Sequence, residues 1–244
     1  KVFLASVRAP KSTSNVTGSN ASLNDRNNDG SIKEFGLDFE AKDFMRSKYI
    51  GKKCHVKVDY IRPANQGYEA KLCGTVYSEG KNIAVVGILK GFLDLVRYRK
   101  DDDERSSEFL ALSTAFDAAK NRKKGIHSVK PYTPFRVVDA SVKATKAKQY
   151  FPFLQRAGSL VGIVDYITSG SRYRVYIPSQ NCIITLVLAG IRTPRSTEPY
   201  GDEALELVQK HFMQRDVEIE VYSTDNTGGF LGSLNAIILI QLNY

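Results

Sequence analysis

The chain has 244 residues, and its 35 lysines and arginines outweigh 26 aspartates and glutamates to give a formal net charge of +9. Hydrophobic residues make up 42% of the sequence, which is enough to bury packed cores, and the sequence has no apolar run long enough to span a membrane. We therefore expect no membrane partner. The positive charge favours an anionic partner, with nucleic acid ahead of a membrane surface, although a soluble basic protein without such a partner would show the same balance.

A short apolar strand ending in proline is expected at residues 2–10, followed by a loop rich in serine and asparagine at 11–31. Residues 25–36 resemble a calcium-binding loop, but Gly36 occupies the twelfth position, where a bidentate glutamate is required. We interpret this segment as a polar turn. Cys54, Cys73 and Cys182 are widely spaced, which fits reduced thiols in a cytosolic or nuclear protein better than a disulfide framework.

An amphipathic helix running into a strand occurs twice, at residues 35–60 and 200–222. Glu40 and Glu203 are equivalent, so the copies are 163 residues apart (203 − 40), and the register holds without a gap. Two such units predict an internal repeat and two domains, at 1–130 and 131–244. We expect the first barrel to lack its N-terminal strands and the second to lack part of its C-terminal end.

The other expected elements follow from hydrophobic periodicity and turn residues. They are strands at 69–77 and 82–86 joined by a turn, helices at 88–96 and 109–122, a strand at 135–142, a polar stretch leading to an aromatic packing segment at 150–154, a hairpin of 162–167 with 172–177, and a strand from 182 to 188. The predicted fold class is mainly β with α. It consists of two tandem five-stranded OB-fold barrels, each with capping helices.

Five segments of the sequence resemble the Tudor–staphylococcal-nuclease family, matching its third and fourth nuclease-like repeats in order. They are VDYIRPA (58–64), RYRKDDDERSS (97–107), KAKQYFPFLQRAG (146–158), SGSRYRVYIP (169–178) and LVLAGIRTPR (186–195). The resemblance implies staphylococcal-nuclease-like barrels in an RNA-binding protein of the cytoplasm and nucleus. It also implies links to RNA silencing, RNA processing and transcriptional co-activation, with protein partners in RNA-silencing complexes.

The resemblance also identifies the positions at which a nuclease of this fold has its calcium ligands, its general base and its two catalytic arginines. A carboxylate base, cations on the phosphate and aspartates on Ca²⁺ are what this chemistry needs. Arg8 and Arg192 stand at calcium-aspartate positions, and cations replace the glutamate base in both copies. The degenerate nuclease positions are Phe3, Arg8, Lys11, Lys71, Ser171, Val187, Arg192, Arg195 and Gly229. We therefore expect no catalytic residue, no metal ligand and no cofactor in these repeats.

Clusters of cations, two of them interleaved with tyrosine, are candidate RNA contacts because phosphates attract cations and bases stack on aromatic rings. The candidates are Arg97, Arg99, Lys100, Lys120, Arg122, Lys123, Lys124, Lys143, Lys146, Lys148, Arg172, Tyr173 and Arg174. These candidates also have structural interpretations. The acidic residues 101–104 could simply neutralise the cations of 97–100, the run 120–124 could be a helix C-terminus, and Tyr173 could face a core.

Three functions stay open from the sequence. The first is RNA binding through backbone charge without catalysis by these repeats. The second is a Ca²⁺-dependent ribonuclease that uses substitute acids, so the sequence leaves enzymatic activity undecided. The third is a protein-interaction scaffold.

Overall fold

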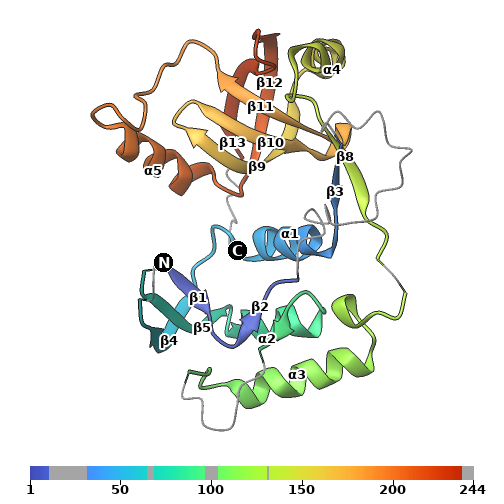
Figure 1. Cartoon of the computed structure of the whole chain (residues 1–244), viewed down its shortest axis with the longest axis vertical. Coiled ribbons are helices and arrows are strands. Elements are labelled where there is room, and N and C mark those ends of the chain that lie inside the picture. Colours follow the sequence, from blue (N-terminus) through green and yellow to red (C-terminus); the bar gives the residue numbers. More distant parts are fainter. Residues whose placement is uncertain (11–31, 65–68, 97–103, 131, 238–244) are drawn as a thin grey trace, which may run out of the picture. The chain divides into compact units, whose positions relative to one another are not determined.

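The computed structural model describes residues 1–10, 32–64, 69–96, 104–130 and 132–237 (Figure 1). These residues fold into two compact units: unit 1 contains residues 1–10 and 35–135, and unit 2 contains residues 32–34 and 136–237. The short segment 32–34 thus folds with unit 2, whereas a simple division at residue 130 would place it with the first repeat. No helix in the described residues is both long and apolar enough to cross a bilayer.

Unit 2 contains a closed five-stranded barrel. Its strands pair in the order β10-β9-β12-β13-β11, and β11 also pairs with β10, which closes the ring. β8 and β3 extend the sheet beyond β11. The strands are β3 (Ile32–Phe35), β8 (Phe135–Asp139), β9 (Leu160–Ser169), β10 (Arg172–Ile177), β11 (Cys182–Leu188), β12 (Asp216–Thr224) and β13 (Phe230–Ala236), and the helices are α4 (Ala144–Ala157) and α5 (Gly201–Phe212).

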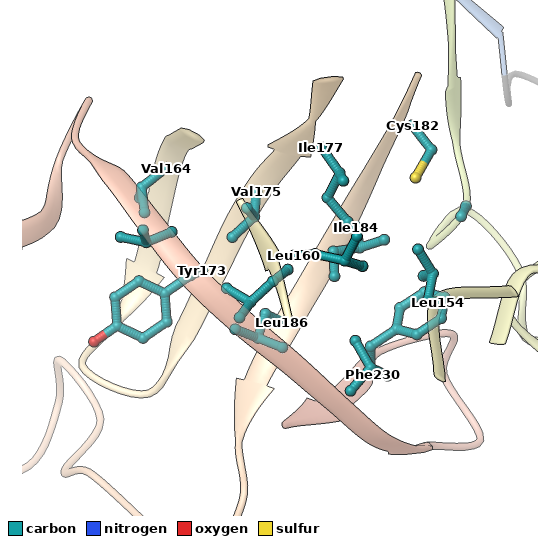
Figure 2. Close-up of a cluster of buried hydrophobic side chains, with 14 of the residues drawn as sticks. Leu154, Leu160, Val164, Tyr173, Val175, Ile177, Cys182, Ile184, Leu186 and Phe230 are labelled. Atoms are coloured by element: carbon teal, nitrogen blue, oxygen red, sulfur yellow. The ribbon is translucent and has the colours of Figure 1, made fainter. Parts of the chain in front are cut away.

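The interior of this barrel is filled by alternate residues of its strands, because successive side chains of a strand point to opposite faces. In β10, Tyr173, Val175 and Ile177 are buried while their neighbours are partly exposed. They pack with Leu186 of β11 and Phe230 of β13, and Figure 2 shows these side chains converging on one core. The predicted hairpin of 162–167 with 172–177 is confirmed as β9 and β10.

Unit 1 is built on a sheet in the order β1-β5-β4, with β6 paired to β5 and a separate pair formed by β2 and β7. In the described residues this sheet does not close into a ring. The strands are β1 (Val2–Leu4), β2 (Val7–Arg8), β4 (His55–Arg62), β5 (Lys71–Ser78), β6 (Lys81–Asn82) and β7 (Asp94–Leu95), and the helices are α1 (Leu37–Tyr49), α2 (Ile83–Leu89) and α3 (Phe109–Asn121). A core from α2, α3 and β7 packs around Ile88 and Leu112.

The repeat expected from the sequence is confirmed at the level of strand register. Helices α1 and α5 lead into strands β4 and β12, and both strands pair antiparallel with the next strand. In unit 1, Val58 pairs with Gly74 and the register then shifts; in unit 2, Val221 pairs with Gly232 and the register shifts at the same point. The two copies therefore share a β-bulge as well as a fold.

A glycine is required at this bulge because the neighbouring backbone approaches too closely for a side chain. A Cβ on Gly74 would lie 2.3 Å from the carbonyl oxygen of Lys57, and a Cβ on Gly232 would lie 2.0 Å from that of Glu220. The same residue type at the same place in both copies shows that the backbone contact is part of the repeat.

Two expectations for local structure were wrong. Residues 82–86 were expected to form a strand, but Asn82 caps α2, and its side-chain oxygen accepts hydrogen bonds from the backbone N–H groups of Ala84 and Val85. The apolar run after Asn82 fits a buried helix as well as a strand, and the cap decides between them. The helix predicted at 88–96 is therefore placed too late, since α2 ends at Leu89 and β7 follows.

Helix α4 was also missed, because Pro152 lies inside it and removes one backbone donor. The helix nevertheless continues, since Ala147 and Leu154 are fully buried on one side of it and pack into the unit 2 core. Tertiary packing therefore outweighs the local cost of the proline. The predicted aromatic segment 150–154 forms the second half of this helix.

The β12–β13 turn is organised by the carboxylate of Asp225. Its Oδ1 accepts hydrogen bonds from the Thr227 backbone N–H (2.8 Å), the Thr227 hydroxyl (2.7 Å) and the Gly229 N–H (2.7 Å). Burial alone would raise the pKa of Asp225, but these hydrogen bonds and the charge of Arg172 outweigh it and lower the pKa below its ordinary value. The ionised carboxylate thus holds the turn in place.

Gly232→Ala should destabilise the protein by roughly 2–3 kcal/mol or more, because the added methyl group cannot fit beside the Glu220 carbonyl without moving β12 away from β13. Thermal unfolding followed by circular dichroism measures the loss. Gly190→Ala is the matched control, since Gly190 has a φ of +73° and open space around it, and should cost only about 1 kcal/mol. Equal unfolding temperatures for the two variants would contradict the steric explanation.

Asp225→Asn should lower stability by on the order of 1 kcal/mol at pH 7, because a charged acceptor is replaced by a neutral one. A carboxyl group whose pKa is lowered by folding stabilises the folded protein at pH values above its unfolded-state pKa, which is about 3.9. This stabilisation is lost as the pH falls through the folded-state pKa. The unfolding temperatures of the wild type and the variant should therefore differ at pH 7, and this difference should begin to shrink below about pH 4 and disappear once the pH is below the folded-state pKa. A constant difference from pH 7 to pH 3 would show that the charge has no part in the effect.

Candidate nucleic-acid interface

Contacts in unit 2 link the β9–β10 turn to the loop that follows β11. The hydroxyl of Thr193 donates to the hydroxyl of Ser171 at 3.3 Å. Gly170 lies so close to Thr193 that a Cβ on it would be 2.8 Å from the threonine methyl group. These two segments therefore lie side by side at one end of the barrel.

Two further segments join the same end. Arg172, at the start of β10, lies 3.7 Å from the carboxylate of Asp225 in the β12–β13 turn. Gly228 in that turn faces the beginning of α4, where a Cβ on Gly228 would meet the Ser141 carbonyl oxygen at 2.9 Å and the backbone of Lys143 at 3.1 Å. Figure 1 shows α4 beside β12, against which it packs. We call the positive side chains that these four segments carry the cationic rim, and they are Lys143, Lys146, Arg172, Arg192 and Arg195.

Two guanidinium groups of the cationic rim are available to a ligand. Arg192 and Arg195 are exposed, and neither has an ion-pair partner within the part of the chain that the structure describes. The loop around them is held in place, because the Arg195 backbone N–H donates to the Glu198 carboxylate at 2.9 Å. Gly201 closes the loop against the Arg195 carbonyl oxygen, where a Cβ would lie only 1.9 Å away. The loop thus presents fixed backbone and free positive charge.

The residues at this barrel end are unsuited to hold calcium. Of the nuclease positions assigned by the resemblance, Ser171 offers a hydroxyl, and Arg192 and Arg195 offer positive charge, where Ca²⁺ needs several oxygen ligands and net negative charge. Val187 lies half-buried in β11, and Gly229 donates its N–H to Asp225. Across the described residues, no three His, Cys, Asp or Glu side chains come together in a group that could hold a metal ion.

The equivalent residues of unit 1 are engaged within the fold. Arg8 donates from Nε (2.8 Å) and Nη2 (2.6 Å) to the same oxygen of Asp94, joining β2 to β7. The ammonium groups of Lys1 and Lys71 lie 5.5 Å and 5.3 Å from the ring centroid of Phe3, within the range of a cation–π interaction. Lys11 falls outside the described residues. The first copy has therefore replaced its nuclease residues with internal contacts.

Two of the predicted RNA contacts are structural instead. Tyr173 is 1% exposed and its hydroxyl donates to the Gly170 carbonyl at 2.9 Å, so its ring has no free face for a base. Arg174 donates to Asp139 at 2.6 Å. The Asp139 side chain is only 7% exposed and also has Lys33 at 3.5 Å, so this cluster connects β10, β8 and β3. Strand alternation explains the buried tyrosine, since Arg172 and Arg174 point the other way.

The other predicted cations divide between the two units. Those at the C-terminal end of α3, in unit 1, are exposed and have no ion-pair partner among the described residues; they are Lys120, Arg122, Lys123 and Lys124. Lys143 and Lys148 are exposed and Lys146 is half-buried at the start of α4. Arg97, Arg99 and Lys100 fall outside the described residues. Arg192 and Arg195 were identified from the sequence only as lost nuclease positions, although their positive charge could have placed them among the candidate phosphate contacts.

The sequence pattern of the family described as "Staphylococcal nuclease homologue" matches residues 1–129 and 185–243 of the chain. "Staphylococcal nuclease domain-containing protein 1" of Drosophila melanogaster is 37% identical over 93% of this chain and 27% of its own length, and the Schizosaccharomyces pombe protein of the same name is 37% identical over 83% and 24%. "Ribonuclease TUDOR 1" of Arabidopsis thaliana is 35% identical over 80% and 23%. The chain thus spans about a quarter of the length of these relatives. With more than half of its residues matched, the chain belongs to the staphylococcal nuclease family.

Proposed function

We propose that this chain is an RNA-binding module of a Tudor–staphylococcal-nuclease protein, made of its third and fourth nuclease-like repeats, and that these repeats do not cleave RNA. The observation that carries the proposal is the pair of exposed arginines, Arg192 and Arg195, which have no ion-pair partner among the described residues and stand where a nuclease of this family would bind calcium and activate water. The proposal includes a place in RNA silencing, RNA processing or transcriptional co-activation, in the cytoplasm and possibly the nucleus, with protein partners in RNA-silencing complexes. This part rests on the resemblance of the five sequence segments to the Tudor–staphylococcal-nuclease family.

Phosphate is the ligand that best fits the cationic rim. Guanidinium groups bind phosphate oxygens through paired hydrogen bonds, and two of them on one short loop can contact neighbouring phosphates. The first turn of α4 has no acidic residue, so the positive end of the helix dipole adds to Lys143 and Lys146. Because these groups recognise the backbone and not the base edges, we expect binding with little sequence preference.

Replacing both rim arginines, Arg192→Glu and Arg195→Glu, should weaken binding of a single-stranded RNA by more than about tenfold at low salt, because two phosphate contacts become repulsive. The slope of log affinity against log salt should fall as well. Fluorescence anisotropy with a labelled RNA of mixed sequence measures both quantities.

Two control variants alter charge on α5 away from the rim, since residue 210 lies roughly 13 Å along α5 from its first residue. Lys210→Glu combined with Glu206→Lys leaves the net charge unchanged, and Lys210→Glu alone tests a single charge reversal. These controls should change affinity much less than the double arginine variant. A wild-type affinity that does not change between 50 and 200 mM salt, or an equal loss in the Lys210 variant, would contradict binding through the rim.

A Ca²⁺-dependent ribonuclease is the second candidate, and it is favoured by the names of two relatives, "Ribonuclease TUDOR 1" and "Ribonuclease TUDOR 2", at 35% and 36% identity. Acids near the second motif, such as Glu198 and Asp202, are the substitutes that it would require. Glu198 already accepts the Arg195 N–H, and Asp202 lies in the first turn of α5, where negative charge stabilises the helix.

The purified chain should therefore leave a labelled RNA intact at millimolar Ca²⁺ as well as in chelator, because the described residues hold no group of acidic side chains that could replace the lost calcium ligands. Denaturing gel electrophoresis after prolonged incubation measures cleavage, and a ribonuclease inhibitor controls for contamination. Ca²⁺-dependent products that disappear in an Asp202→Asn or Glu198→Gln variant would establish the ribonuclease and overturn the proposal.

A further inference from the structure

The loop that carries the two rim arginines ends in a tyrosine with an open ring. Tyr200 is 75% exposed, the largest fraction of any aromatic residue in the part of the chain that the structure describes. Among those residues its ring packs on no other aromatic ring and its hydroxyl makes no hydrogen bond. A single exposed aromatic side chain is common on a protein surface. The backbone and the neighbours of Tyr200 are what give it a further meaning.

The backbone of Tyr200 is held against the rim loop. Its φ of +65° and ψ of 9° lie in the left-handed region, which a bulky residue enters only where surrounding contacts impose it. The Tyr200 carbonyl accepts the Ala204 N–H of α5 at 3.0 Å, and the next residue, Gly201, donates its N–H to the Glu198 carbonyl at 3.1 Å. Gly201 also lies directly against the Arg195 carbonyl, as its steric contact shows. The tyrosine is therefore positioned beside a rim arginine.

The charges around Tyr200 distinguish what can bind at the ring from what can bind at the arginines. Asp202 and Glu203 are exposed in the first turn of α5, directly after the tyrosine, and they would repel a phosphate placed at the ring. A nucleobase is uncharged and has a flat face that stacks on aromatic side chains. Phosphate at the guanidinium groups and a base on the tyrosine therefore satisfy both parts of this loop.

We propose that Tyr200 is a base-stacking platform of the cationic rim, and that the rim accordingly takes single-stranded RNA in preference to a duplex. An unpaired base can turn out and lie on the ring while Arg195 contacts a neighbouring phosphate. The bases of a duplex are already paired and stacked within the helix, so the ring has no base face to meet. The inference rests on the proposed function, because it assumes that RNA phosphates bind the rim.

Tryptophan fluorescence tests the stacking directly. The sequence contains no tryptophan, so Tyr200→Trp introduces a single reporter that keeps an aromatic platform at this position. A single-stranded RNA of mixed sequence should quench the emission of this variant. Inorganic polyphosphate, which offers the charge of the backbone without bases, should compete with the RNA for the chain but leave the emission unchanged.

Affinities measured by fluorescence anisotropy provide the second readout. Tyr200→Ala should weaken binding of the single-stranded RNA by roughly tenfold, as expected for the loss of one stacked base, and Tyr200→Phe should bind like the wild type. The affinity for the same RNA annealed to its complement should not change in Tyr200→Ala. Phe153→Ala is the matched control, because Phe153 is 63% exposed but lies roughly 13 Å along α4 from its first residue, and it should bind like the wild type.

The results separate a failure of this inference from a failure of RNA binding by the rim. If Arg192→Glu with Arg195→Glu weakens binding but Tyr200→Ala does not, or if bound single-stranded RNA leaves the emission of Tyr200→Trp unchanged, the stacking platform is wrong and the proposed function stands. An equal loss for single-stranded and duplex RNA in Tyr200→Ala would likewise overturn the platform, because the ring would then contact the backbone. If the arginine variant binds RNA as the wild type does, both proposals fail.

Discussion

Closure of the unit 2 sheet by the pairing of β10 with β11 is the interaction on which the rest of that unit depends. It buries the inner face of both strands and fixes the β9–β10 turn beside the loop after β11, so that Ser171 meets Thr193. Unit 1 has the same bulged strand pair and the same helix before it, but β1 and β4 each have one open edge in the described residues. The bulged strand pair and its helix therefore occur in both units, and the described residues include the closing hairpin in unit 2.

The sign of the charge at the barrel end then determines what the closed fold can do. A metal-dependent nuclease concentrates carboxylates there, which requires a cation to offset their repulsion. In unit 2 the same loop carries Arg192 and Arg195, whose repulsion is relieved by an anion. The one carboxylate that organises the neighbouring turn, Asp225, accepts three hydrogen bonds and lies near Arg172, so it is committed to the fold. The scaffold is thus retained while the charge that this barrel end carries changes sign.

Sequence reasoning could predict the elements whose signals are periodic or duplicated, such as α1 with β4, α5 with β12, and the β9–β10 hairpin. It failed where a short-range feature or tertiary packing decided the outcome. The Asn82 cap turns an apolar run into α2, and the burial of Leu154 carries α4 through Pro152. The cations could be identified as residue types, but only strand alternation and partners in space distinguish the paired Arg174 from the unpaired Arg192.

The two copies have also diverged in how they use their replacement cations. In unit 1, Arg8 is neutralised by Asp94, and Lys1 and Lys71 are held over Phe3. An ion pair that links two strands and a cation–π contact both give up positive charge that could attract a phosphate. In unit 2, Arg192 and Arg195 have no such internal partner in the described residues. The nuclease positions are thus occupied by internally paired residues in the first copy and by exposed arginines in the second, which are the groups that we propose contact phosphate.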